Sequence, residues 1–257
     1  MSLRTVAVIP ARYGSTRFPG KPLALIAGKP MIQRAYESTL RCPEIAEVVV
    51  ATDDERIRTA VEGFGGHAVM TSPEHKTGTD RIAEAIQKIS ADLIINVQGD
   101  EPLMAADVLS KLIQKMQETG AEMGTAAVPF SVSGRSPEDP NAVKVVLDAK
   151  GFALYFSRSL IPFPRSGGQA VEALLHWGLY AYTRDFLQKF VTWPQSPLEG
   201  CEMLEQLRAL ENAAKIWVLV THQRSIGVDI PSDIARVEKM LAEQESKGCH
   251  CGTSEND

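Results

Sequence analysis

The order of apolar and polar positions predicts strands that alternate with helices through the first hundred residues. Short apolar runs at 6–9, 48–51 and 93–97 have the length and the β-branched content of strands that are buried on both faces. Between these runs, apolar residues recur at helical spacing after Pro30 and after Asp54. This β-α-β order predicts an α/β fold with a doubly wound, mainly parallel sheet.

The pattern changes between about 124 and 182, where strand-like runs are separated by Gly, Pro and Asp turns. This spacing predicts an inserted antiparallel subdomain beside the parallel sheet. We expect a single domain over 4–245 that contains this smaller subdomain, followed by a disordered tail over 246–257. The tail contains Cys249-His250-Cys251, which lacks the second pair of ligands that a structural zinc site needs.

A later helix start is marked by Ser196 and Glu199, which form a capping-box pattern around Pro197. On one continuous helix from this point, Glu199, Glu202 and Gln206 share a face. Glu199 is used by the capping box, whereas Glu202 and Gln206 remain free to bind a polyhydroxylated ligand or to form a solvated face.

Composition narrows the class of protein. The apolar content of 44% and the charged content of 23% are those of soluble globular proteins, and the net charge of −5 argues against broad nucleic-acid binding. The sequence has no apolar run of the roughly 18 residues that span a membrane, and no signal peptide precedes the first strand. We therefore expect a cytoplasmic protein that binds neither nucleic acid nor a membrane.

The loop after the first strand concentrates positive charge. It carries Arg12, Arg17 and Lys21 among small residues, and ligands of open α/β sheets bind beyond the carboxyl ends of the strands. Guanidinium forks and an ammonium suit the clustered oxygens of a nucleoside triphosphate. The spacing matches neither a Walker loop nor a dinucleotide fingerprint; the alternative is a solvated loop with scattered charges.

Two aspartates are candidate metal ligands. Asp100 follows the buried run at 93–97, and Asp229 lies at a later strand-to-helix junction. Carboxylates beside a triphosphate site are typical ligands of Mg²⁺. Read alone, Asp100 could form a turn and Asp229 could cap a helix; together they predict a bipartite magnesium site.

Several segments in series resemble the 3-deoxy-manno-octulosonate (Kdo) cytidylyltransferases, also called CMP-Kdo synthetases. The resemblance covers roughly residues 4 to 242. The segments that carry it are Arg12–Lys21, Ala51–Ile57, Gly78–Arg81, Asn96–Pro102, Leu198-Glu199 with Glu202–Arg208, and Gly227–Asp229.

The resemblance implies a cytoplasmic, Mg²⁺-dependent homodimer with a nucleotide-binding α/β fold and a smaller subdomain that carries much of the dimer contact. It implies that CTP and Kdo are coupled to CMP-Kdo and pyrophosphate for lipopolysaccharide synthesis. Arg12 and Lys21 would then bind the triphosphate, Arg81 would lie near the cytosine, and Asp100 and Asp229 would bind magnesium. The residues implied to face the sugar acid are Gln98, Arg165, His176, Tyr182, Glu202 and Gln206.

Three departures from the family pattern bear on the substrate. Lys76-Thr77 stands where Pro-Ser is common, Phe163-Pro164-Arg165 replaces a more usual Tyr-Asp-Arg, and Ile230 takes a place often held by Thr. The alternatives are therefore an 8-amino-Kdo analogue, another sugar acid or a sugar 1-phosphate, with Arg158 as the rival of Arg165 for the carboxylate. A glycosyltransferase or a non-catalytic nucleotide-binding module are more distant readings.

Overall fold

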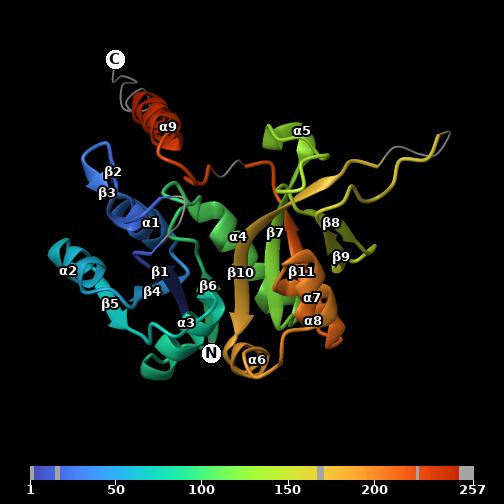
Figure 1. Cartoon of the computed structure of the whole chain (residues 1–257), viewed down its shortest axis with the longest axis horizontal. Helices are drawn as coiled ribbons and strands as arrows, with labels where there is room; N and C mark the ends of the chain where they lie inside the picture. The colour runs from blue at the N-terminus through green and yellow to red at the C-terminus, as the bar shows by residue number, and fades with distance from the viewer. Residues whose placement is uncertain (1–2, 15–17, 167–170, 224–225, 249–257) are drawn as a thin grey trace, which may run out of the picture.

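The structure is a computed structural model that describes residues 3–14, 18–166, 171–223 and 226–248. Within these ranges nine strands form one sheet, and seven of them follow the order β11-β7-β10-β6-β1-β4-β5 (Figure 1). The strands are β1 (Thr5–Ala11), β4 (Ile45–Thr52), β5 (His67–Met70), β6 (Leu93–Asn96), β7 (Met123–Pro129), β8 (Lys144–Leu147), β9 (Ala153–Ser157), β10 (Leu174–Thr183) and β11 (Ile216–Val220). A separate ribbon consists of β2 (Leu25–Ile26) and β3 (Lys29–Pro30).

Helices cover both faces of this sheet. In chain order they are α1 (Met31–Leu40), α2 (Glu55–Gly63), α3 (Gly78–Ala85), α4 (Ala106–Thr119), α5 (Phe130–Ser133), α6 (Arg184–Phe190), α7 (Pro197–Glu202), α8 (Gln206–Glu211) and α9 (Asp233–Gly248), with 3-10 turns η1 (Lys21–Leu23) and η2 (Ile86–Lys88). One core layer packs α1, α2 and α4 on the sheet, and the other packs α3, α6 and α8. Both faces of β1 are therefore buried, which explains its uninterrupted apolar run.

The strands pair in the predicted way. β1 is parallel to β4 and β6, and β4 is parallel to β5. In the region predicted to be antiparallel, β10 lies antiparallel between β6 and β7 and also pairs with β8 of the β8–β9 hairpin, whereas β7 is parallel to β11. The predicted α/β fold class, a mainly parallel sheet with antiparallel strands added, is confirmed. The role of the inserted subdomain in dimer contact stays a prediction, as do the domain boundaries.

The region after Ser196 differs from expectation. The capping box is present in part: the Ser196 N–H donates to Glu199 Oε2 at 3.1 Å, while Ser196 Oγ has no hydrogen-bond partner in the described part of the chain. However, the helix ends at Glu202, since Met203 adopts the left-handed conformation with φ 52°. The prediction of one continuous helix is wrong: α7 and α8 are separate, and Glu202 and Gln206 do not share a helix face.

The end of the chain is a helix, α9, which packs on a small cluster with β2 and residues 226–228. It reaches Gly248, so residues 246–248, which were expected to belong to a disordered tail, are part of the helix. The Cys249-His250-Cys251 segment lies outside the described residues. Among the helices that the structure describes, none is long and apolar enough to cross a membrane.

Candidate active site

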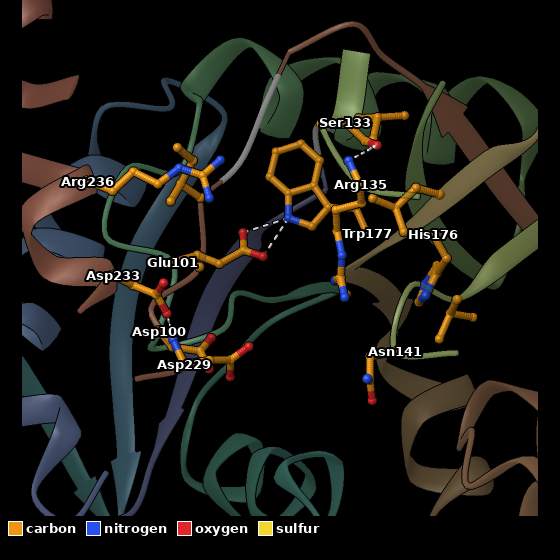
Figure 2. Close-up of a pocket in the computed structure, with 17 residues that line it drawn as sticks. Asp100, Glu101, Ser133, Arg135, Asn141, His176, Trp177, Asp229, Asp233 and Arg236 are labelled. Carbon is orange, nitrogen blue, oxygen red and sulfur yellow. Dashed lines mark hydrogen bonds between the residues drawn. The ribbon is translucent and has the colours of Figure 1, made fainter. Parts of the chain in front are cut away.

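Two cavities meet at Asp100, beyond the carboxyl ends of the parallel strands. The first, of about 460 Å³, is lined by Arg12, Lys21, residues 75–78, Arg81, Gln98 and Asp100. The second, of about 540 Å³, is lined by Asp100, Glu101, Arg135, Asn141, His176, Trp177, Asp229 and Arg236, among others (Figure 2). Asp100 contributes to both walls, so groups bound in the two cavities would approach each other at this residue.

The loop that follows β1 is folded back on itself. The Gly20 N–H donates to the Tyr13 carbonyl oxygen at 3.0 Å, and Gly20 has φ 70°. A Cβ at Gly20 would lie 3.1 Å from the Tyr13 ring, so both the conformation and the space favour glycine there. The Arg56 guanidinium lies 3.3 Å from the centre of the Tyr13 ring. Arg12 lines the first cavity, whereas Arg17 lies outside the described residues.

Lys21 spans the loop and the candidate metal ligands. Its ammonium donates to Asp100 Oδ2 at 2.6 Å and to the Val228 carbonyl oxygen at 3.0 Å. The Val228 N–H in turn donates to the Asp100 carbonyl oxygen at 2.9 Å. One lysine thus connects the first loop, the loop after β6 and the segment that carries Asp229.

The far wall of the first cavity is held by side-chain contacts of Arg81 and His75. Arg81 is 4% exposed and donates to Thr71 Oγ1 at 2.6 Å and to Asp53 Oδ2 at 2.8 Å. His75 Nε2 lies 2.5 Å from Glu84 Oε2. Because Arg81 and His75 both line the cavity, these pairs fix the shape of its wall.

The chemistry of Asp100 and Asp229 suits a hard cation. Figure 2 shows their carboxylates side by side, and the Lys21 ammonium already stands as a cation against Asp100. In the described part of the chain no group of three or more His, Cys, Asp or Glu side chains could hold a metal ion. A pair of carboxylates that leaves the other positions to substrate phosphates and water is how Mg²⁺ is commonly held.

His176 belongs to the wall of the second cavity. The Thr125 hydroxyl lies 2.7 Å from the Leu179 carbonyl oxygen, to which it donates, and 3.0 Å from His176 Nε2. The hydroxyl has a single proton, so this pattern assigns the ring proton to Nε2 and leaves Nδ1 as the acceptor. Desolvation by burial lowers the pKa of His176 to about 3, which keeps the ring neutral near pH 7.

Some predicted sugar-acid residues lie elsewhere. Tyr182 is 1% exposed and packs between the rings of Tyr180 and Phe186 in the core. Glu202 accepts from Ser157 Oγ at 2.7 Å and from the Arg158 N–H at 2.9 Å. Neither residue lines the two cavities.

The two candidate arginines have different surroundings. The Arg158 guanidinium donates to the carbonyl oxygens of Pro140, Glu202 and Met203. Arg165 is exposed in the segment between β9 and β10 and lines neither cavity. Gln98 lines the first cavity and donates to the Gly178 carbonyl oxygen at 3.3 Å.

Glu205, which lies in a polar cluster behind the first cavity together with the predicted residue Gln206, was missed by sequence reasoning. Glu205 Oε2 accepts from Thr79 Oγ1 at 2.5 Å, while Glu205 Oε1 and Gln206 Nε2 are buried without a partner in the described part of the chain. Burial raises the pKa of Glu205, and the nearby hydroxyls of Thr79 and Thr77 oppose this rise; Thr77 also lines the first cavity. Glu205 is next to Gln206 in the sequence, but one continuous helix would place Glu202 and Gln206 on a shared face and would leave Glu205 off that face.

The comparisons with known proteins agree with this geometry. A family model described as cytidylyltransferase matches residues 6–216. The chain is 51% identical over 244 residues to the 3-deoxy-manno-octulosonate cytidylyltransferase of Syntrophotalea carbinolica, covering 91% of this chain and 97% of the relative. It is 47% identical to the 8-amino-3,8-dideoxy-manno-octulosonate cytidylyltransferase of a Shewanella species, covering 93% and 99%.

A solved structure shares the whole fold. CMP:2-keto-3-deoxy-manno-octonic acid synthetase complexed with CTP superposes with a TM-score of 0.88 at 43% identity, covering 94% of this chain and 99% of that one. The expected family resemblance is confirmed. The chain belongs to the 3-deoxy-manno-octulosonate cytidylyltransferase family.

Proposed function

We propose that this chain couples CTP with Kdo to give CMP-Kdo and pyrophosphate. The observation that carries the proposal is the meeting of a cationic cavity and a second polar cavity at Asp100, whose carboxylate lies beside that of Asp229. The names of the curated relatives and the CTP complex of the similar structure support both substrates.

The first cavity suits the nucleotide. Arg12 and Lys21 would hold triphosphate oxygens, with Arg17 as a further predicted contact. A guanidinium and an ammonium both donate charge-assisted hydrogen bonds to phosphates. We propose that Arg81, fixed by Asp53 and Thr71, faces the cytosine side of this cavity.

We propose Mg²⁺ as the metal, held by Asp100 and Asp229. When bound, it supplies Lewis-acid polarisation of the phosphoryl group and neutralises charge. The chain's own contribution is placement: the backbone bond from Val228 to Asp100 keeps the two metal-ligand segments adjacent. The Lys21 ammonium contacts both segments. When the nucleotide binds, this ammonium would replace its hydrogen bond to Asp100 by one to a phosphate oxygen.

The reaction is an in-line displacement at the α-phosphorus. The anomeric oxygen of the sugar acid forms the new P–O bond, the bond to the β-phosphate breaks, pyrophosphate leaves, and the anomeric proton is released. The residues accelerate this step by holding the reactants in line and by offsetting charge on the leaving pyrophosphate. Arg12 and Lys21 serve the second purpose.

The second cavity suits the sugar acid. We propose that the neutral ring of His176 contacts its hydroxyls from the wall of this cavity, and that Gln98 does so from the first cavity, next to Asp100. We also propose Gln206 and Glu205, buried behind the first cavity, as hydroxyl contacts, because buried polar atoms without partners are costly. Tyr182, Glu202 and Arg165 stay predictions from the family resemblance.

Other properties of the family are proposals for this chain. We propose that it works as a cytoplasmic homodimer in lipopolysaccharide synthesis, using the cytoplasmic nucleotide CTP. Large apolar side chains on β9 and on the β9–β10 segment support a protein contact there, since Leu154 is 61% exposed and Phe163 is 82% exposed.

The test measures pyrophosphate release with CTP, UTP, GTP and ATP, each offered with Kdo and with its 8-amino analogue. We expect release with CTP and Kdo.

Asp100→Asn should abolish pyrophosphate release at an unchanged melting temperature, because the change removes a charged ligand but keeps the volume of the side chain. Near wild-type release by this variant at saturating Mg²⁺ would contradict the metal role, and a preference for the amino analogue would favour the alternative substrate.

A further inference from the structure

Glu101, the neighbour of Asp100, has a different environment from the candidate metal ligands. Both of its carboxylate oxygens lie 2.6 Å from the indole Nε1 of Trp177, which donates to them (Figure 2). Glu101 is 9% exposed and Trp177 is 6% exposed. A charge-assisted bond between groups this well buried is stronger than the same bond in water.

The bond attaches the loop after β6 to β10. The Gln98 side chain donates to the Gly178 carbonyl oxygen of the same part of β10 at 3.3 Å. Within the loop, the Glu101 N–H donates to the Gln98 carbonyl oxygen at 3.1 Å. Two side-chain bonds to β10 therefore bracket Asp100 in the sequence, one on each side of it.

We propose that Trp177 is a positioning residue for the metal ligand Asp100. Its indole holds the loop at 98–101 so that Asp100 faces Asp229, and it keeps the Glu101 carboxylate away from the ion. This inference rests on the proposed metal role of the two aspartates. Groups that orient metal ligands typically change metal affinity by about 10- to 100-fold when they are removed.

The location of Trp177 gives this bond a second consequence. Trp177 follows His176 directly, and the two side chains lie on opposite faces of β10, packing in different core layers. The strand that presents His176 to the sugar cavity is thus the strand that holds the metal loop. One segment of β10 therefore positions both His176 in the sugar cavity and the loop that carries Asp100.

The experiment measures Mn²⁺ binding by electron paramagnetic resonance, with CTP present and no sugar acid, so that no turnover occurs. We expect Trp177→Phe to weaken Mn²⁺ binding by about tenfold, since the ring remains but the donor is lost. Glu101→Gln keeps an acceptor and should stay within about twofold of the wild type. Trp217→Phe, on β11 at the end of the strand order and separated from β10 by β7, is the matched control and should leave Mn²⁺ affinity unchanged.

Glu101→Leu tests the same bond from its other end and is used if Trp177→Phe does not fold. It should weaken Mn²⁺ binding as Trp177→Phe does, and the double variant should be no weaker than either single variant. Wild-type Mn²⁺ affinity in folded Trp177→Phe or Glu101→Leu would overturn the positioning role alone. Failure of the wild-type protein with CTP to bind Mn²⁺ would overturn the proposed metal site together with it.

Discussion

At the scale of single residues, Lys21 connects the two halves of the proposed chemistry. Its ammonium lies 2.6 Å from a carboxylate that we assign to a metal ion, so lysine and metal compete for the same oxygen. The competition ends if a triphosphate draws the ammonium away. Nucleotide and metal are then expected to strengthen each other's binding, and this reciprocity is a thermodynamic requirement.

Replacing Lys21 with Ala should therefore act in two directions. Turnover should fall, because a preorganised cation at the leaving group contributes on the order of 2–4 kcal/mol of transition-state stabilisation. Mn²⁺ should bind the nucleotide-free protein more tightly than in the wild type. Steady-state kinetics and metal titration check the two effects, with Lys29→Ala, whose partner is the surface residue Glu37, as the control. A Lys21 variant that affected only the apparent affinity for the sugar acid would show that the loop is misassigned.

The low pKa of His176 predicts how the free energy of unfolding depends on pH. Its pKa is near 3 in the folded protein and near 6.5 when unfolded, so the unfolded chain binds more protons between these values. The free energy of unfolding should then decrease as the pH falls from about 6.5 toward 3. Urea denaturation at pH 7, 6 and 5 should show a smaller decrease for His176→Phe than for the wild type, while the exposed His222→Gln variant should match the wild type. Equal pH dependence in all three proteins would mean that His176 does not stay neutral.

At the scale of elements, the break between α7 and α8 depends on one backbone conformation. Met203 has φ 52° and is 71% exposed, so its side chain contributes little burial to offset the conformation. The two short helices are joined instead by a buried ion pair, in which Arg208 donates to both Glu199 carboxylate oxygens at 2.6 and 2.8 Å.

Met203→Gly should stabilise the protein by about 0.5–1 kcal/mol, because glycine adopts a positive φ without the steric cost. Met203→Ala removes the same exposed side chain but keeps Cβ and should bring no gain. Denaturant unfolding of both variants distinguishes the backbone effect from the loss of the side chain. A gain shared equally by Ala and Gly would point to the exposed thioether instead.

The elements also show what sequence periodicity can and cannot predict. β1, β4 and β6 were predictable because burial on both faces leaves an apolar run. Asp54 was predictable as a helix cap and does accept from the Arg56 N–H. The left-handed Met203 could not be predicted, since methionine is a good helix former and nothing in Glu202-Met-Leu-Glu-Gln206 marks a stop.

At the scale of the whole molecule, the candidate site also combines features that the sequence could predict with features that it could not. Arg12 and Asp100 could be placed together because parallel strands bring their carboxyl ends to one edge of the sheet. The bond between Glu101 and Trp177 joins residues 76 positions apart. No local pattern encodes that contact, because it depends on β10 entering the sheet antiparallel between β6 and β7.

The irregularity in β10 has a consequence for the insertions and deletions that this strand can accept. Opposite β7, Trp177 pairs with Ala126 and Tyr180 with Thr125, so Gly178 and Leu179 are two extra residues in β10. An even number preserves the alternation of faces, whereas one residue more or fewer would invert every side chain on one side of that point. Insertions and deletions at this position are therefore restricted to pairs if His176 and Tyr180 are to remain on the same side of the sheet.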